Sequence, residues 1–195
     1  MSKENEEIAL LGGSFNPVHN HHVRMGDTLL EKNIIDGVLI IPCKNHALNK
    51  QLAHAEDRIN MINLAFNNPK IKVSRIEIES EEVNYTINTI RKLKQQYPDK
   101  TLYWVIGADI LHEMREKWYN VPDLLKETKF IIFNRDNYEL TPVPGMDIRA
   151  ILNIKTNNES STEVRDRVKK GLSIRELVPL PVQKYIEKRG LYKEE

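Results

Sequence analysis

The side chains best suited to chemistry are three histidines, His19, His21 and His22, which follow a segment that begins with Gly12 and Gly13. Glycines after a strand let the backbone approach a phosphate closely, and the exposed amides there can bind its oxygens. His19 and His22 lie three residues apart at the predicted start of a helix, where free amides and the helix dipole favour anions. Two imidazoles at this position could donate hydrogen bonds to phosphate oxygens. The segment therefore predicts a phosphate-binding site.

Other interpretations of this segment are weaker. It is not a GxGxxG dinucleotide fingerprint, and it lacks the GK[ST] ending of a Walker loop. A metal site or an incidental histidine cluster is the alternative. Zinc is disfavoured, because Cys43 is the only cysteine and no second ligand cluster at helical spacing is evident.

A second candidate segment lies near the C-terminus, where Ser160, Ser161 and Thr162 precede a charged helical stretch. Hydroxyl residues in such a place are natural helix N-caps, which is the simpler interpretation. The amides and hydroxyls of a helix start can also bind phosphate, and Arg165 stands one turn into the helix. Taken alone, the segment supports either interpretation.

The elements that must position these residues follow from the spacing of apolar residues. Short apolar runs predict buried strands, and a partly alternating segment at 71–78 predicts a strand near an edge of the sheet. The buried runs cover residues 8–11, 38–41, 102–106 and 130–133. Helical spacing covers residues 22–32, 56–66, 85–97, 110–116 and 121–127. Residues 137–145, with two prolines and no period, are expected to form a loop.

Strands that alternate with helices predict an α/β fold with a Rossmann-like, doubly wound parallel sheet. Ligands bind such sheets beyond the carboxyl ends of the strands, where residues 12–15, 42–46 and 107–109 are expected to lie. Two further helical stretches, 162–170 and 181–189, form a small C-terminal elaboration.

Size and composition place the chain among globular proteins. Its 195 residues suit a single domain over 1–195, with a sheet core at about 8–135 and a C-terminal phosphate-binding helix and tail at about 160–192. Hydrophobic residues make up 40%, and 29 basic against 28 acidic residues argue against a general nucleic-acid or membrane-surface binder. One cysteine allows no intrachain disulfide, the first residues lack the features of a signal peptide, and no apolar run could span a bilayer. We expect a soluble, cytoplasmic protein.

The first segment resembles a specific family signature. Residues 12–22 are similar to the GxFxPxHxGH motif of the adenylyltransferase superfamily with paired histidines, with His21 in place of the usual glycine. Residues 160–165 resemble the same superfamily's ISSTxxR motif, with Glu159 where isoleucine is usual. The resemblance implies that the two histidines and Arg165 act on the phosphates of ATP, and that no side chain attacks covalently.

Three further strings narrow the resemblance to nicotinate or nicotinamide mononucleotide adenylyltransferases. They are residues 84–89, residues 106–109 together with Trp118 and Tyr119, and residues 173–179 together with 182–187. The resemblance extends over about 8–192 and is weakest over 134–158. Pantetheine-phosphate adenylyltransferases and other small-molecule nucleotidyltransferases, such as cytidylyltransferases for alcohol phosphates, are the alternative. A nucleotide-binding module without catalysis would be expected to lack one of the phosphate-binding residues.

The resemblance implies roles for individual residues. His19, His22 and Arg165 are the expected catalytic residues. The expected ATP-binding residues are Gly12, Gly13, Ser14, Phe15, His19, His22, Gly107, Asp109, Ser161, Thr162 and Arg165. The expected mononucleotide-binding residues are Ser14, Phe15, Thr86 and Trp118. Lys44, Lys50 and Arg135 are weaker candidates for phosphate contacts, since most loop cations only cover the surface.

Three of these residues also have simpler explanations. The Trp118 indole suits stacking on a pyridine ring, but it could be ordinary core packing. Asp109 could accept hydrogen bonds from ribose hydroxyls, act as a helix N-cap, or both. Thr86 could present its amide to a carboxylate or carboxamide of the substrate, or only cap a helix.

The implied substrates are ATP and a nicotinate or nicotinamide mononucleotide, with the nicotinate form preferred because helix-start amides favour a carboxylate. Mg²⁺ is the expected cofactor, held by substrate phosphates and water rather than by protein ligands. We expect no nucleic-acid or membrane partner, and a homo-oligomer remains open.

Overall fold

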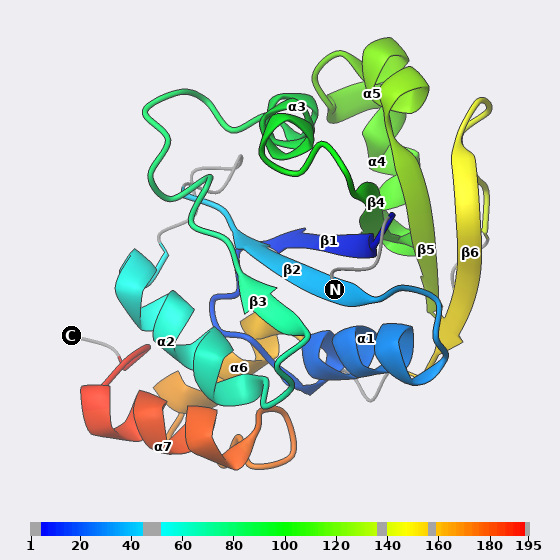
Figure 1. The fold of residues 1–195 in the computed structure, drawn as a ribbon. Helices are drawn as coiled ribbons and strands as arrows, with labels where there is room; N and C mark the ends of the chain where they lie inside the picture. Colours follow the sequence, from blue (N-terminus) through cyan, green and yellow to red (C-terminus); the bar gives the residue numbers. More distant parts are fainter. Residues whose placement is uncertain (1–4, 45–51, 136–139, 156–158, 194–195) are drawn as a thin grey trace.

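The structure is a computed structural model that describes residues 5–44, 52–135, 140–155 and 159–193. The strands are β1 (Glu7–Gly13), β2 (Gly37–Pro42), β3 (Ile71–Val73), β4 (Thr101–Gly107), β5 (Lys129–Arg135) and β6 (Asp147–Ile154). The helices are α1 (Asn20–Glu31), α2 (Ala55–Ala65), α3 (Thr86–Gln96), α4 (Ala108–Lys117), α5 (Val121–Glu127), α6 (Ser161–Lys169) and α7 (Leu180–Arg189). Among the described residues, the six strands form one parallel sheet in the order β3-β2-β1-β4-β5-β6 (Figure 1).

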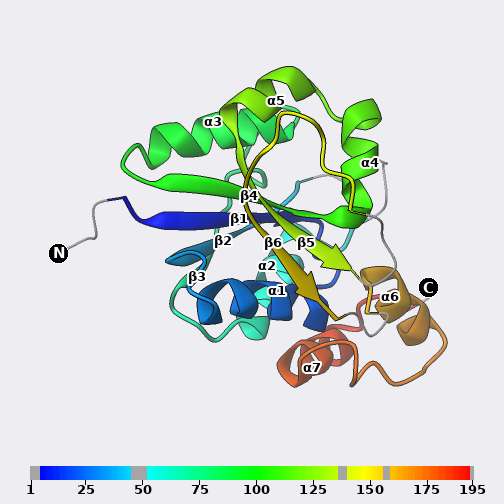
Figure 2. The same ribbon diagram turned by 90° about the vertical axis from the view of Figure 1, so that its right-hand side faces the viewer.

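Helices cover both faces of this sheet. Helices α1, α2, α6 and α7 lie on one face, and α3, α4 and α5 lie on the other (Figures 1 and 2). The side chains of β1 supply both layers, because Ala9 and Leu11 pack toward the first group and Leu10 toward the second. Burial on both faces explains why the inner strands read as continuous apolar runs. The predicted doubly wound α/β fold is confirmed.

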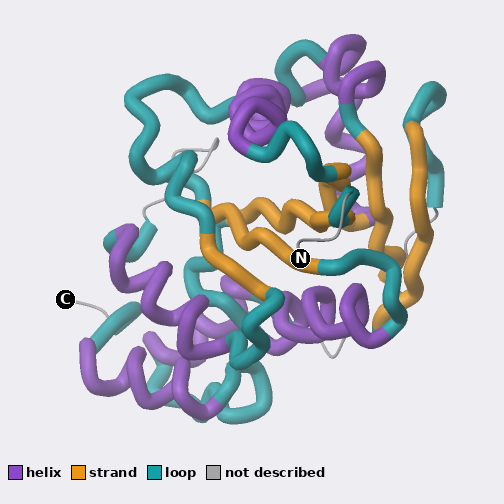
Figure 3. The backbone as a smooth tube through the Cα atoms, viewed as in Figure 1, coloured by secondary structure: helices purple, strands orange, loops and turns teal. Residues whose placement is uncertain are grey.

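The sheet opens between β1 and β4 at its carboxyl edge. The paired residues of these strands end at Leu10 and Trp104, whereas the strands continue to Gly13 and Gly107. The chain moves outward from β1 to β2 and β3 on one side, and from β4 to β5 and β6 on the other. This is the topological switch point of a doubly wound sheet, where ligands bind in folds of this class. Loops leave the strands at this edge (Figure 3).

The predicted edge strand at 71–78 is correct in place but too long. β3 is an edge strand, yet it ends at Val73, and the amide of Ser74 donates the last hydrogen bond toward β2, to the carbonyl of Ile40 at 2.8 Å. The chain then turns, because the amide of Glu79 donates to the carbonyl of Arg75. The partial alternation beyond Val73 therefore belongs to a packed loop.

β6 was not predicted from the sequence. It forms the other edge of the sheet, and its side chains alternate between exposed and partly buried positions until Ile154. Its pairing with β5 is interrupted by a register shift between Phe130 and Ile131. An exposed edge strand has no long apolar run, which is why the pattern at 147–154 gave little signal.

Within the described part of the chain, no helix has both the length and the apolar character needed to cross a membrane.

Candidate functional site

The two glycines that end β1 are required by close packing with aromatic rings. A side-chain carbon at Gly12 would lie 2.7 Å from two ring carbons of Trp104, so a larger residue would displace the indole. At Gly13 the same carbon would lie 3.3 Å from the ring of Phe15. The sequence explains these glycines only by the close approach of the backbone to a phosphate, and the structure adds their packing against aromatic rings as a second reason.

The Phe15 ring packs against the start of α1. Its backbone has a positive φ of 46°, a conformation that few residues other than glycine adopt and that recurs at functional sites. The ring is buried, and its centroid lies 4.8 Å from that of His22. Phe15 thus provides an apolar contact for His22, one of the paired histidines.

The rings of the paired histidines lie against each other at the start of α1, with centroids 3.8 Å apart and planes tilted by 35°. His19 is the N-cap residue, and its backbone amide donates to Nδ1 of His22 at 3.3 Å. Because Nδ1 of His22 accepts this bond, the proton of the neutral ring is carried on Nε2. His21 points into the protein and is buried. The geometry leaves His22 with a donor that can serve an anion.

The start of α6 packs directly on the loop that follows β1. The Ser161 hydroxyl donates to the carbonyl of Pro17 at 2.8 Å, although the two residues are 144 positions apart. Arg165 donates through Nη1 to the carbonyl of Asn16 at 2.7 Å and through Nη2 to the Thr162 hydroxyl at 3.3 Å. The two sequence motifs therefore meet in one site.

The capping role and the candidate phosphate role fall on different hydroxyls of this segment. Ser160 is the N-cap of α6, and its side chain accepts from the amide of Glu163 at 3.1 Å. The hydroxyls of Ser161 and Thr162 are instead directed to the loop carbonyl and to Arg165. The capping interpretation is therefore confirmed for Ser160, and the phosphate interpretation stays a prediction for Ser161 and Thr162.

Arg58 is a site residue that the sequence analysis missed. Its side chain is buried, and it donates to the carbonyls of Ser14 at 2.8 Å and Ala53 at 3.1 Å. Burial lowers the pKa of Arg58. The available signal was a cation at helical spacing from Met61 and Ile62, both of which are buried.

The C-terminal tail also reaches the loop after β1. Asn16 is buried, and its Oδ1 accepts from the Tyr192 hydroxyl at 2.9 Å and from the amide of Ala53 at 3.0 Å. Burial raises the pKa of the Tyr192 hydroxyl, which keeps it a hydrogen-bond donor. Sequence reasoning gave no signal for this contact, which joins residues 176 positions apart.

Gly107 and Asp109 form the other wall of the opening between β1 and β4. The carboxylate of Asp109 lies directly against the backbone of Gly107, so any side chain at position 107 would displace it. Gly107 is the N-cap residue of α4, and Asp109 lies in the first turn. The suggestion that Asp109 is itself the N-cap is therefore wrong, while its carboxylate remains near the helix start.

Thr86 and Trp118 are brought toward each other by a pair of tyrosines. Thr86 is the first residue of α3 after its N-cap residue Tyr85, and Trp118 is the C-cap residue of α4. The rings of Tyr85 and Tyr119 stack with centroids 4.3 Å apart, and their side chains are well exposed. Trp118 is half-buried against the core on this face of the sheet, so it is partly a packing residue.

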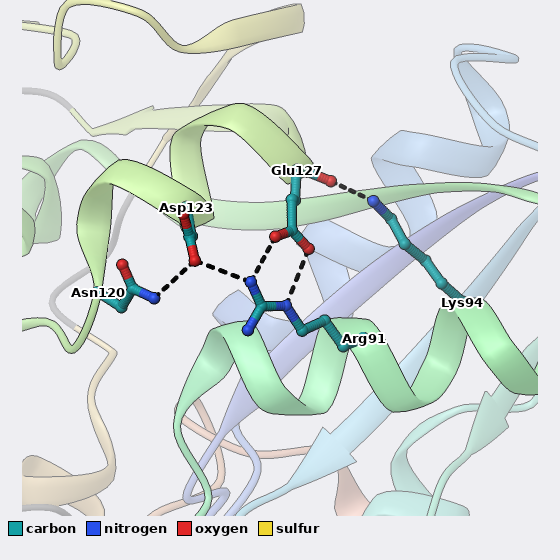
Figure 4. A network of polar contacts seen from close by, with 5 residues as sticks. All are labelled: Arg91, Lys94, Asn120, Asp123 and Glu127. Carbon is teal, nitrogen blue, oxygen red and sulfur yellow. Dashed lines mark hydrogen bonds and ion pairs between the residues drawn. The ribbon is translucent and has the colours of Figure 1, made fainter.

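A polar network holds α3 against α5 (Figure 4). Arg91 of α3 contacts Glu127 of α5 through Nε at 3.0 Å and Asp123 through Nη2 at 2.9 Å. Asn120 donates to the same Asp123 carboxylate at 2.8 Å, and Lys94 donates to the carbonyl of Glu127. The network therefore links α3, which begins with Thr86, to the turn that follows Trp118.

The weaker candidates for phosphate contacts are Lys44, Lys50 and Arg135, and the structure describes the side chain of Lys44 alone among them. The Lys44 ammonium donates to the carbonyl of Ser80 at 2.6 Å, in the loop between β3 and α3. Lys50 lies outside the described residues. Arg135 ends β5, and its side chain likewise lies outside the described part.

Glu77 is a second residue that sequence reasoning missed. It lies in the loop between β3 and α3, and its buried carboxylate accepts from the Thr89 hydroxyl at 2.8 Å. Burial raises the pKa of Glu77 to about 7, while the Thr89 hydrogen bond acts in the opposite direction. Its carbonyl accepts from Asn84, so Glu77 fixes the approach to α3.

Comparisons with known proteins identify the family and the fold. Residues 10–167 match the family model described as cytidylyltransferase-like. The nicotinate-nucleotide adenylyltransferase of Bacillus subtilis (strain 168) is 34% identical over 191 residues, which cover 96% of this chain and 98% of that protein. The nicotinic acid mononucleotide adenylyltransferase of Plasmodium falciparum, complexed with NaAD, superposes with a TM-score of 0.82 at 24% identity. That alignment covers 96% of this chain and 98% of the other.

Proposed function

Because the chain belongs to the cytidylyltransferase-like family, and within it to the nicotinate-nucleotide adenylyltransferases, we propose that its site joins ATP to nicotinate mononucleotide. The products are the NAD-type dinucleotide and pyrophosphate, as a step of NAD biosynthesis. The observation that carries this proposal is the meeting of His19, His22 and Arg165 around the loop that follows β1. This cluster lies at the switch point of the sheet, where a nucleotide is expected.

The reaction requires little covalent help from the protein. A phosphate oxygen of the mononucleotide forms a bond to the α-phosphorus of ATP, and the bond from that phosphorus to the bridging oxygen of pyrophosphate breaks. The attacking oxygen is already an anion, so no strong general base is needed. The barrier comes from bringing two polyanions together and from charge that develops on pyrophosphate, so positioned donors supply the catalysis.

The histidines and Arg165 suit this task. Nε2 of His22 carries a proton at the start of α1, where helix amides also face outward. Arg165 brings a fixed positive charge to the same loop. Its guanidinium donates to the Asn16 carbonyl, and we propose that phosphate oxygens recruit it when ATP binds.

The structure suits Mg²⁺ that enters with ATP. The proposed phosphate residues are hydrogen-bond donors and cations, and the one carboxylate among the proposed ATP-binding residues, Asp109, packs against Gly107. Among the described residues, no group of three histidine, cysteine or acidic side chains could hold a metal ion. Mg²⁺ bound to phosphate oxygens and water would neutralise part of their charge.

The mononucleotide is proposed to bind between α3 and the Trp118 turn. The first amides of α3 can donate to the carboxylate of the pyridine ring, which favours nicotinate over nicotinamide mononucleotide. Trp118 would cover the ring, while Ser14 and Phe15 would contact the shared phosphate region. The Tyr85–Tyr119 stack keeps these two walls together.

An acceptor panel tests the proposal. Purified protein is incubated with ATP, Mg²⁺ and, in separate reactions, nicotinate mononucleotide, nicotinamide mononucleotide or pantetheine phosphate, and pyrophosphate release is measured. We expect the highest specificity constant with nicotinate mononucleotide. Higher activity with pantetheine phosphate would overturn the function, and a several-fold higher specificity constant for the amide would overturn the acid preference.

A further inference from the structure

A partly buried ion pair joins α1 to the segment that leads into α6, the two helices whose starts carry the proposed phosphate-binding residues. Arg24 of α1 donates through Nη1 to Oε1 of Glu159 at 2.8 Å, and Nη2 contacts the second carboxylate oxygen. The Glu159 side chain is 2% exposed and that of Arg24 is 35% exposed. Arg24 also donates to the carbonyl of Lys155 at 3.4 Å. The pair is bidentate, a geometry that fixes orientation as well as distance.

The place of this pair in the fold is specific. Arg24 lies on α1 shortly after His19 and His22, and Glu159 directly precedes Ser160, the N-cap residue of α6. One side-chain contact therefore ties the helix that carries the paired histidines to the start of the helix that carries Arg165.

Other contacts between these regions use groups that ATP would recruit. The Ser161 hydroxyl and the Arg165 guanidinium hold the carbonyls of Pro17 and Asn16 in the structure. Under the proposed function, phosphate oxygens would compete for these donors, and the contacts would weaken when the triphosphate binds. Arg24 and Glu159 are not among the proposed phosphate ligands, so their contact does not use a donor that the triphosphate needs.

The charge and burial of the pair support a positioning role rather than a contribution to stability alone. A nearly fully buried carboxylate is unfavourable unless it is paired and hydrogen-bonded, and an apolar pair of similar volume often gives equal or greater stability. The Glu159 hydrogen bond raises the pKa of Arg24, so the guanidinium stays charged. What the ionic pair adds over apolar packing is a defined geometry between α1 and α6.

We propose that Arg24 and Glu159 are a positioning pair that sets the distance between the starts of α1 and α6, so that both helices bind one triphosphate at the same time. Neither residue touches the substrate. The inference rests on the proposed function for the identity of the triphosphate.

The experiment compares three variants with the unchanged protein. Arg24→Met removes the guanidinium, Glu159→Gln keeps the size and one acceptor, and Arg24→Met/Glu159→Ile replaces the pair with apolar side chains. The matched control is Arg167→Met, which breaks the exposed contacts of α6 with Glu163 and with the carbonyl of Ser173. For each protein we measure the melting temperature, the KM of both substrates, kcat, and the Kd of ATP by calorimetry without acceptor.

A positioning role predicts a specific pattern. Both single variants weaken ATP binding by about tenfold, while the KM of the mononucleotide changes little. The double variant recovers the melting temperature but keeps the weakened ATP binding. The control variant behaves as the unchanged protein does. Glu159→Gln keeps the test usable if Arg24→Met does not fold.

Two results would overturn the inference. One is unchanged ATP affinity in both folded single variants. The other is a double variant that recovers ATP affinity together with the melting temperature, which would mean that the pair acts through stability alone. Failure of the proposed function is seen separately, as absence of product from the unchanged protein with either pyridine mononucleotide. The calorimetric Kd of ATP tests the pair in that case as well.

Discussion

At the scale of single residues, the site depends on where protons and charges are held before the substrate arrives. The His19 amide orients His22 through Nδ1 and leaves Nε2 as the donor. The Arg58 guanidinium, which is missing from the sequence motifs, fixes the carbonyls around Ser14. Such preorganised groups need little rearrangement when charge develops on the leaving group.

Replacement of His22 tests its donor directly. His22→Ala removes one donor without opening the core, and turnover should fall about 10²–10³-fold by analogy with oxyanion-type donors. ATP binding should weaken far less, because the contact is strongest in the transition state. Arg165→Ala should weaken both, since its charge meets phosphate in both states. Near-normal turnover of folded His22→Ala protein would remove His22 from the mechanism.

Replacement of Trp118 should affect the binding of the mononucleotide more than that of ATP. Trp118→Ala should weaken mononucleotide binding by roughly 0.5–1.5 kcal/mol beyond the lost burial, because a stacking partner is gone. The affinity for ATP should change much less. Titration of each substrate into the folded variant measures both values, and equal weakening of the two would show that Trp118 is only a packing residue.

Glu77 gives the free energy of unfolding a pH dependence of known sign. Its pKa is raised from 4.5 to about 7 in the folded protein, so the unfolded chain releases this proton first as the pH rises. Stability should therefore fall between about pH 4.5 and pH 7, by about 3 kcal/mol from this residue. Glu77→Gln should remove that slope in urea unfolding at several pH values. Glu81→Gln, an exposed change in the same loop, serves as the control, and a slope that survives in Glu77→Gln would refute the assignment.

At the scale of elements, the site lies between pairs of helix starts that other contacts hold in place. α1 and α6 meet at the loop after β1. On the other face of the sheet, α3 is tied to α5 by the Arg91 network, and the stacked tyrosines tie its start to the turn between α4 and α5. Each substrate is thus proposed to have its own pair of elements.

The Arg91 network should affect only one substrate. Arg91→Gln removes the charged contacts to Asp123 and Glu127 and loosens α3 against the Trp118 turn. We expect the KM of the mononucleotide to rise by a few-fold, with that of ATP unchanged, because exposed ion pairs contribute modestly and are screened by salt. Arg75→Gln, which breaks an exposed network between α2 and the loop after β3, is the control. A parallel rise in both KM values would contradict this separation.

At the scale of the whole molecule, the C-terminal helix α7 packs against α2, and the tail after it reaches the loop that follows β1. Asp57 of α2 accepts from the Tyr185 hydroxyl at 2.7 Å and from Nε of Arg189 at 3.2 Å, which anchors α7. The tail then places Tyr192 against Asn16. The tail after α7 therefore contacts the first motif directly.

Tyr192→Phe should test this contact between the tail and the loop after β1. The change removes one hydrogen bond, while Asn16 Oδ1 keeps the amide of Ala53, so stability should fall by about 1 kcal/mol. Thermal and urea unfolding measure the loss. The reference is Tyr97→Phe, a ring outside this contact. If Tyr192→Phe unfolds as the unchanged protein does, the tail does not stabilise the loop.

Much of the fold could be predicted from the sequence because its signals are local. The buried strands appear as short apolar runs at 8–11 and 130–133, and the helices appear as repeats near 3.6 residues. The two motifs also contain residues whose place at helix starts follows from local capping preferences, as Ser160 shows. Together with the family resemblance, these patterns were enough to predict the class of fold and the reaction.

Only the tertiary structure decided which polar side chains act together. Arg24 meets Glu159 across 135 positions, Tyr192 meets Asn16 across 176, and Arg58 turns inward to bind carbonyls from three separate segments. β6 was missed for a related reason, since an edge strand is recognised by its neighbour β5 rather than by its own pattern. Periodicity reports which face of an element is buried, but it carries no information about which distant segment covers that face. The partner of a buried charge is set by packing, and so is its pKa, as Glu77 and Thr89 show.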